Sequence, residues 1–176
     1  AASLAGVDAV LKGKIIRVNS QEGDLDRSTK KGYVKKEVKT KNDEGETVKD
    51  YEYYKTEYTE YRQQNRASLE VSFQLISTAE GEIIVTDQFR ITETDEVHYA
   101  IYRGDDDRLV PGYWADRRND SPRDVIRDKK EDVRALKSLL DAEKEVKTVE
   151  ALKSALYDQA VDHIVKKIDQ YNPENS

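Results

Sequence analysis

The sequence predicts an α+β fold, in which a twisted, largely antiparallel sheet with long projecting hairpins is covered on one face by two C-terminal helices. Three observations predict this fold. Apolar and polar residues alternate along 67–78, which is typical of a strand with one buried and one solvated face. The tyrosine-rich segment 30–66 has a strong turn signal near its middle. Apolar residues spaced three or four apart along 149–168 indicate an amphipathic helix.

The strands are expected in the following order. Aliphatic and β-branched residues predict a first strand at 5–18, followed by a polar loop at 19–28. The alternating segment 67–78 is the clearest strand, and it ends in a turn at 79–82. The segment 83–92 then returns beside it, which completes a hairpin.

Residues 30–66 are expected to form a charged hairpin that projects from the sheet. Residues 30–41 carry six positive charges and one negative charge, and 43–60 carry seven negative charges and two positive charges. The turn signal Asn42-Asp43-Glu44-Gly45 joins the two runs. A disordered linker is the alternative interpretation of two such runs.

Opposite charges suggest a register for this hairpin. Folding the chain about the turn places Lys35 beside Glu52 and Lys41 beside Glu46. Each such pair contributes roughly 0.2–1 kcal/mol. The same register places Glu37 against an acidic residue, Asp50, and places Val34 beside Tyr53.

Two helices are expected in the last third of the chain. Ser121 as the capping residue, Pro122 at the first helical position and Asp124 in the first turn predict a helix from 121 to about 146. A second helix is expected to start after Thr148 and to end near Tyr171. Its apolar stripe consists of Val149, Leu152, Leu156, Ala160, Ile164 and Ile168.

Composition limits the classes of function. A chain of 176 residues predicts a single domain over 1–176, and 38% charged residues with 2 Phe and 1 Trp predict a modest core. A net charge of −6 argues against a nucleic-acid partner, and the acidic strand expected beside the basic run 30–41 should cancel much of its positive field. The absence of cysteine excludes disulfides and thiolate chemistry. No apolar run approaches the length of a membrane-spanning helix.

The sequence contains no recognisable active-site pattern. Neither a glycine-rich phosphate loop nor a G-x-S-x-G nucleophile turn occurs. Two distant histidines, His98 and His163, do not make a zinc site, and residues 105–107 lack the ligand spacing of a calcium loop. The sequence therefore predicts a protein that is not an enzyme and that uses no cofactor and no metal.

Aromatic side chains are the candidate contacts for a polypeptide partner, because tyrosine and tryptophan dominate the energetics of many interfaces. Burial under a loop is the alternative for Trp114, and the same alternative applies to the hairpin tyrosines. Strand edges in the hairpin and in 94–119 are further candidate contacts, since they can pair with a partner strand. The candidate partner-binding residues are Tyr51, Tyr53, Tyr54, Tyr58, Tyr61, Tyr113 and Trp114.

Three separated segments resemble one group of bacterial envelope proteins. Residues 5–15 (AGVDAVLKGKI) resemble the group's strand pattern A-x-x-D-x-h-h-x-G-x-h, where h is apolar. Residues 68–84 (SLEVSFQLISTAEGEII) resemble the hairpin that follows, and 155–171 (ALYDQAVDHIVKKIDQY) resemble the closing helix. The group includes curli-secretion lipoproteins, the amino-terminal domain of TolB and activator lipoproteins of penicillin-binding proteins.

The resemblance implies a mixed sheet packed against helices, with an upstream strand and helix that this sequence does not include. It also implies a protein of the periplasm, outer membrane or cell surface that has no enzymatic activity. Such a protein would meet the membrane only through a lipid anchor outside this sequence. Members of the group bind or assemble other proteins and several oligomerise, so an envelope protein partner is expected and a homo-oligomer is left open.

The chain departs from the group at 21–64, where the curli secretion channel has membrane-spanning hairpins. Lys55 and Glu57 would lie on one strand face and Glu52 and Glu60 on the other, so neither face suits lipid. The leading hypothesis is therefore a non-catalytic accessory or scaffold protein of the cell envelope that binds a polypeptide. The alternatives are a subunit of an oligomeric secretion or appendage assembly, and an enzyme of an unrecognised type.

Overall fold

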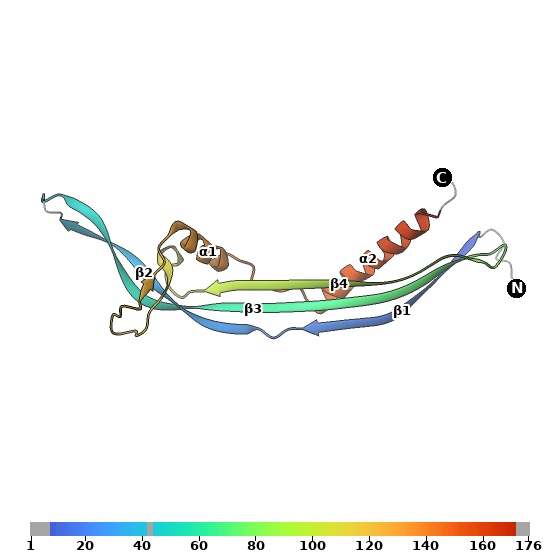
Figure 1. Cartoon of the computed structure of the whole chain (residues 1–176), viewed down its shortest axis with the longest axis horizontal. Helices are drawn as coiled ribbons and strands as arrows, with labels where there is room; N and C mark the ends of the chain where they lie inside the picture. Colours follow the sequence, from blue (N-terminus) through green and yellow to red (C-terminus); the bar gives the residue numbers. More distant parts are fainter. Residues whose placement is uncertain (1–7, 42–43, 172–176) are drawn as a thin grey trace. The chain divides into compact units, whose positions relative to one another are not determined.

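The computed structural model describes residues 8–41 and 44–171. It confirms the α+β class, because a large antiparallel sheet carries two C-terminal helices (Figure 1). The strand order is β1-β3-β2-β5-β6, and β4 also pairs with β3. Among the described residues, no helix has the length and apolar character needed to cross a membrane. The elements are β1 (Ala9–Glu22), β2 (Asp26–Lys41), β3 (Thr47–Ser77), β4 (Ile83–Ile101), η1 (Asp106–Arg108), β5 (Leu109–Tyr113), β6 (Val125–Ile126), α1 (Lys130–Leu140) and α2 (Val149–Asp169).

The described residues form two compact units. Unit 1 consists of residues 8–23, 64–96 and 146–171, and unit 2 consists of 24–63 and 97–145. Strands β3 and β4 each contribute to both units. Because the division does not separate two consecutive blocks of sequence, the single domain expected over 1–176 stays a prediction.

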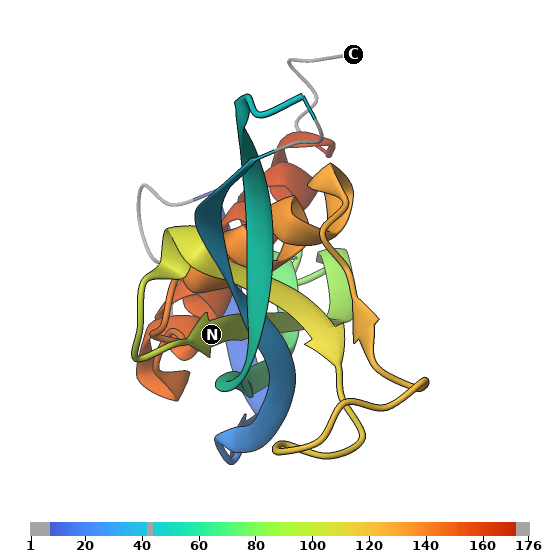
Figure 2. The same cartoon turned by 90° about the vertical axis from the view of Figure 1, so that its left-hand side faces the viewer.

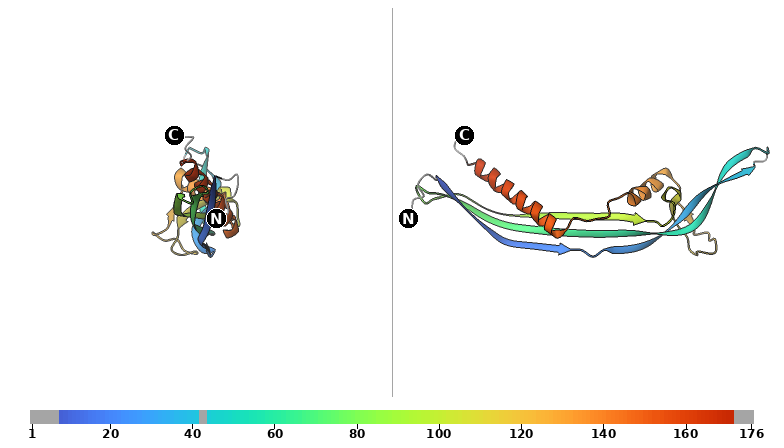
Figure 3. Two further views of the ribbon diagram at one scale, coloured as in Figure 1. Left: turned by 90° about the vertical axis from the view of Figure 1, so that its right-hand side faces the viewer. Right: turned by 180° about the vertical axis from the view of Figure 1, so that it is seen from behind.

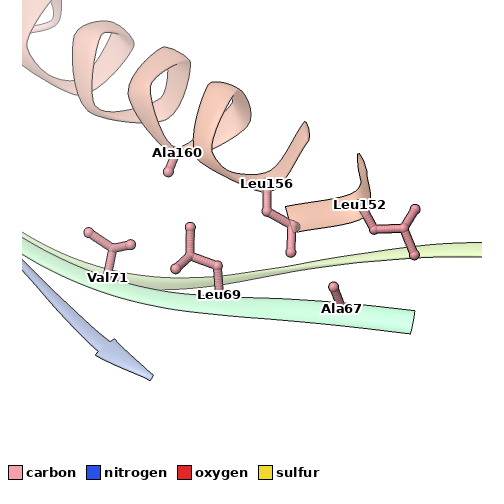
Figure 4. Packing of buried hydrophobic residues seen from close by; sticks show 6 residues of the cluster. All are labelled: Ala67, Leu69, Val71, Leu152, Leu156 and Ala160. Carbon is pink, nitrogen blue, oxygen red and sulfur yellow. The ribbon is translucent and has the colours of Figure 1, made fainter. Parts of the chain in front are cut away.

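In unit 1, helix α2 packs on the alternating part of β3. Ala67, Leu69 and Val71 are buried, and they point toward Leu152, Leu156 and Ala160 of the helix (Figure 4). The partly buried Phe89, Ile91 and Ile164 pack around this cluster. Both the alternation in 67–78 and the apolar stripe of the last helix are therefore confirmed as the two sides of one core.

The start of α2 is fixed by polar contacts. The hydroxyl of Thr148 accepts a hydrogen bond from the backbone N–H of Ala151 at 3.2 Å, so the expected helix start is confirmed. The buried side chain of Asn65 donates to the carbonyl of Lys147 at 2.9 Å and accepts from the N–H of Gly23 at 3.0 Å. The side-chain amide of Asn65, a residue of β3, is thus hydrogen-bonded through both its oxygen and its nitrogen and connects the segment before α2 to the residue after β1.

In unit 2, a second core lies between the hairpin and α1. It consists of Tyr58, Ala100, Leu109, Leu136 and Leu140. Strands β2 and β3 pair antiparallel from Asp26↔Arg62 to Lys41↔Thr47, and Figure 2 shows how strongly the two strands twist about each other. The hairpin expected at 30–66 is therefore present, although Asn42 and Asp43 of its turn signal lie outside the described residues.

The register of the hairpin differs by one residue from the expected one. Lys35 pairs with Tyr53, and Lys41 pairs with Thr47. A one-residue change moves each side chain to the other face of its strand. It also places Glu37 opposite Tyr51, so the unfavourable carboxylate pair of the expected register does not form.

Two further expectations are wrong. The polar loop expected at 19–28 is limited to three residues, since β1 continues to Glu22 and β2 begins at Asp26. The helix expected from Ser121 begins only at Lys130. The carboxylate of Asp124 instead accepts the N–H of Ser121 at 3.2 Å, which closes a turn before β6. Residues 5–7 of the first expected strand lie outside the described part of the chain.

Candidate partner-binding surface

The β2–β3 hairpin presents the candidate tyrosines on two different faces. Side chains alternate along each strand, so Lys31, Tyr33 and Lys35 share one face of β2. The pairing of Lys35 with Tyr53 places Tyr53 and Tyr51 of β3 on the same face. We give the name tyrosine face to Tyr51, Tyr53, Lys31 and Lys35, together with Tyr113, whose ring centroid lies 5.0 Å from Nζ of Lys31.

Lys35 lies at the centre of three contacts on the tyrosine face. Its Nζ is 2.6 Å from Oδ2 of Asp128, which also accepts the hydroxyl of Tyr53 at 2.5 Å. The same Nζ lies 4.0 Å from the ring centroid of Tyr51. A cation over a tyrosine ring is an attractive contact, so it restrains the ring of Tyr51, which is 44% exposed.

The protonation states in this cluster are stabilised by the same contacts. The hydrogen bond to Asp128 raises the pKa of Lys35 above its usual value. Burial alone would raise the pKa of the Asp128 carboxyl, but hydrogen bonds from Lys35 and Tyr53 outweigh it, and the pKa lies below its usual value. Lys35 therefore stays cationic and Asp128 stays anionic at neutral pH.

Lys31 plays a similar part beside β5. Its Nζ donates to the backbone carbonyl of Trp114 at 2.7 Å and lies 5.0 Å from the ring centroid of Tyr113. The hydroxyl of Tyr33 donates to the carbonyl of Tyr113 at 3.0 Å. Tyr113 is 47% exposed, so it is the second exposed ring on the tyrosine face.

Lys55 organises the loop 115–124. Its Nζ donates to the carbonyls of Asp116 and Asn119, at 3.0 and 2.7 Å, and lies 2.6 Å from Oδ2 of Asp124. The hydrogen bond from Lys55, with a second one from the N–H of Ala115, holds the pKa of Asp124 below its usual value. A mostly buried lysine thus holds an exposed loop in one conformation against the hairpin.

Only some of the seven predicted residues are accessible to a partner. Tyr54 is 49% exposed but lies on the opposite face of β3, where its hydroxyl donates to Glu52. Tyr61 is half-buried and stacks on Tyr99, with 5.0 Å between the ring centroids. The exposed residues are Tyr51, Tyr54 and Tyr113, the half-buried ones are Tyr53 and Tyr61, and the buried ones are Tyr58 and Trp114.

Tyr58 and Trp114 are buried inside unit 2. Burial, with the charge of Glu60 adding to it, raises the pKa of Tyr58 to about 12. Nε1 of Trp114 lies 3.3 Å from the carbonyl of Gly32 and 3.2 Å from that of Thr56, so its polar edge is satisfied inside the unit. Burial, the alternative considered for Trp114, is therefore confirmed, and neither ring is presented on the surface.

The residues that fix this surface carry no clear signal in the sequence. The basic run 30–41 predicts ion pairs between its lysines and acidic residues of the neighbouring strand. Lys35 instead contacts Asp128, at a separation of 93 positions, and Lys55 contacts Asp124. Local charge patterns carry no information about such distant partners.

Side chains that could hold a metal ion are paired in other ways. His98 contacts Glu60 at 3.2 Å, and His163 contacts Asp87 at 3.0 Å. Asp105 caps η1 by accepting the N–H of Asp107 at 3.1 Å. Among the residues that the structure describes, no group of three or more His, Asp or Glu side chains is placed to hold a metal.

Comparison of the chain with protein family models, with curated proteins and with solved structures gives no match. The resemblance of three segments to envelope lipoproteins therefore stays a prediction from the sequence.

Proposed function

We propose that this protein is a non-catalytic accessory or scaffold protein of the bacterial cell envelope, and that it binds a polypeptide partner through the tyrosine face. The observation that carries the proposal is the pair of exposed rings, Tyr51 and Tyr113, each beside a lysine that is itself held in place. Tyrosine offers a large amphipathic contact with few rotatable bonds, and a restrained ring loses little further freedom when a partner binds.

The surroundings of the two rings support protein binding over chemistry. A general base or nucleophilic lysine needs a pKa lowered toward neutrality. Here hydrogen bonds to Asp128 and Asp124 raise the pKa values of Lys35 and Lys55. Both ammonium groups therefore stay charged and bound to carboxylates of this chain, which suits residues that hold the surface in place rather than act as bases or nucleophiles.

The cellular compartment in the proposal is supported by the sequence resemblance of residues 5–15, 68–84 and 155–171 to envelope lipoproteins. Fractionation of the source bacterium with an antibody against the protein tests this part. We expect the protein with the periplasmic or outer-membrane fraction. Recovery with cytosolic enzymes contradicts the envelope assignment and leaves the binding proposal to be tested separately.

Site-specific crosslinking tests the tyrosine face. A photoreactive phenylalanine replaces Tyr51 or Tyr113 in living cells, and Tyr171, an exposed tyrosine of unit 1, provides the matched control position. We expect the same discrete crosslinked protein from both face positions and none from the control. Equal crosslinking from all three positions contradicts the proposal.

Substitution of the rings gives the second test, with the crosslinked partner purified. We expect Tyr51→Ser combined with Tyr113→Ser to weaken its binding about a hundredfold, since two interface tyrosines are removed. Tyr54→Ser, on the opposite face of β3, should leave the affinity unchanged. An equal loss in both variants assigns no special role to the tyrosine face.

A further inference from the structure

Strand β1 leaves one of its two backbone edges open. It pairs with β3, from Ala9↔Ser77 to Glu22↔Asn65, and β4 lies on the far side of β3. Figures 1 and 3 show β1 as the edge strand of unit 1. Within the described part of unit 1, the other edge of this 14-residue strand has no partner strand. Its outward N–H and C=O groups are therefore available to an added strand.

The side chains of β1 on the face toward α2 are apolar and exposed. Ile15 pairs with Val71 and Val18 pairs with Leu69, so both point toward the side of the sheet that carries the helix. Val71 and Leu69 are buried by α2, whereas Ile15 is 53% exposed and Val18 is 37% exposed. Leu11, on the same face, is 48% exposed. The apolar layer therefore extends past the helix to the open edge.

The opposite face of β1 is cationic. Lys12, Lys14 and Arg17 pair with Gln74, Ser72 and Glu70 of β3. Glu70 accepts a hydrogen bond from the side chain of Gln88 at 2.9 Å. Among the ion pairs of the described residues, none includes Lys12, Lys14 or Arg17. Three unpaired cations thus gather on one strand of a chain whose net charge is −6.

This charge pattern indicates which kind of strand can bind at the open edge of β1. A second copy that added its own β1 antiparallel would bring two sets of three cations onto one face of the joined sheet, and like charges on facing strands are destabilising. A strand with acidic side chains on that face would gain opposite-charge pairs instead. On the face toward α2 the same strand needs apolar side chains, which would cover Leu11, Ile15 and Val18.

We propose that the open edge of β1 binds an extended polypeptide segment in which apolar and acidic side chains alternate. The segment adds as a further strand, with its apolar side chains beside Ile15 and Val18 and its acidic side chains beside Lys12, Lys14 and Arg17. This contact lies on unit 1 and does not depend on the tyrosine face, so the protein has two separate surfaces for polypeptide.

A labelled peptide of alternating Glu and Val residues is the probe, and a peptide of alternating Lys and Val residues is its matched control. Fluorescence anisotropy with the whole chain is expected to show binding of the acidic peptide and at least tenfold weaker binding of the basic one. Reversing two charges with Lys12→Glu and Lys14→Glu is expected to weaken the acidic peptide about tenfold and to strengthen the basic one. Circular dichroism verifies that the variant is folded.

Hydrogen exchange locates the bound peptide. We expect amides of β1 to become protected when the acidic peptide is added, and Ile15→Asp to abolish both protection and binding. Equal binding of the two peptides, unchanged exchange in β1, or retained binding by Ile15→Asp overturns the proposal.

The variant with both Tyr51→Ser and Tyr113→Ser is expected to bind the acidic peptide as the unchanged chain does. Loss of peptide binding in that variant would also overturn the proposal. Light scattering that shows a dimer without peptide, with Ile15→Asp monomeric under the same conditions, assigns the edge to a second copy instead.

Discussion

Nζ of Lys35 and Oδ2 of Asp128 lie 2.6 Å apart, although 93 positions separate the two residues in the chain. The pair joins β2 to the residues just before α1. Both side chains are about a quarter exposed, at 29% and 26%, so solvent screens this contact less than a surface ion pair. Because Asp128 also accepts the hydroxyl of Tyr53, one carboxylate organises the middle of the tyrosine face.

Replacing Asp128 with Asn is expected to lower the free energy of unfolding of unit 2 by about 1 kcal/mol. The amide keeps the shape of the side chain but removes the charge that Lys35 needs. Urea unfolding followed through the fluorescence of Trp114, the single tryptophan of the chain, measures the change. The matched control is Asp107→Asn, whose exposed ion pair with Lys137 should contribute almost nothing. Equal losses in the two variants would contradict this assignment.

Acid is expected to destabilise unit 2. The pKa values of Asp124 and Asp128 lie below their usual value in the folded state. Their contribution is therefore complete above the usual carboxyl pKa of about 4. It is lost as the pH falls through the lower pKa values of the folded state, because the unfolded chain takes up protons first. Urea midpoints at about pH 5 and about pH 3 measure the loss. Asp128→Asn should show a smaller loss than the unchanged chain.

Gly112→Ala is expected to destabilise unit 2 by about 1–3 kcal/mol. An added Cβ would lie 2.5 Å from the carbonyl oxygen of Val125 and 2.7 Å from the ring of the buried Tyr33, so the backbone or this ring would have to shift. Gly13→Ala is the matched control, because nothing lies within 4 Å of its added Cβ. Thermal unfolding of the two variants distinguishes them. A large loss for Gly13→Ala and none for Gly112→Ala would be inconsistent with the packing around β5.

Leu156→Ala is expected to destabilise unit 1 by about 2–5 kcal/mol, because the side chain is buried against Leu69 and Ala67 and leaves a cavity. Val161→Ala, on an exposed position of the same helix, should change stability by less than about 0.5 kcal/mol. Far-ultraviolet circular dichroism during urea unfolding measures both. If Val161→Ala costs as much as Leu156→Ala, α2 uses a different face from the one described.

The elements with a strong periodic pattern were predictable from the sequence. The stripe along α2 and the alternation along 67–78 each describe one buried face, and the two faces meet. The helix start after Thr148 was also correct, because its signal is a local hydrogen bond. The start expected at Ser121 relied on the same kind of signal. It failed because Lys55 and nearby backbone N–H groups bind Asp124 and hold 121–124 in a turn.

The candidate surface was only partly predictable. Composition indicated that tyrosines would form it, but exposure depends on packing partners that lie far away in sequence. Tyr58 is buried by Leu136 and Leu140 of α1, and Trp114 is buried where its indole N–H can reach two strand carbonyls. Charge pairing gave a hairpin register that was wrong by one residue, and Lys35, which it placed beside Glu52, instead binds the distant Asp128.

The segments of unit 2 are complete earlier in the sequence than those of unit 1, and this order affects folding during synthesis. Unit 2 draws on no residue after 145, whereas unit 1 requires α2. Whether the chain emerges from a ribosome or from a translocation channel, its amino-terminal part appears first, so unit 2 has all of its segments before α2 appears. Leu69 and Val71 then lack the helix that buries them. A chain that ends at residue 145 should therefore expose the apolar face of the sheet in unit 1 to solvent, and we expect it to bind chaperones that hold unfolded chains.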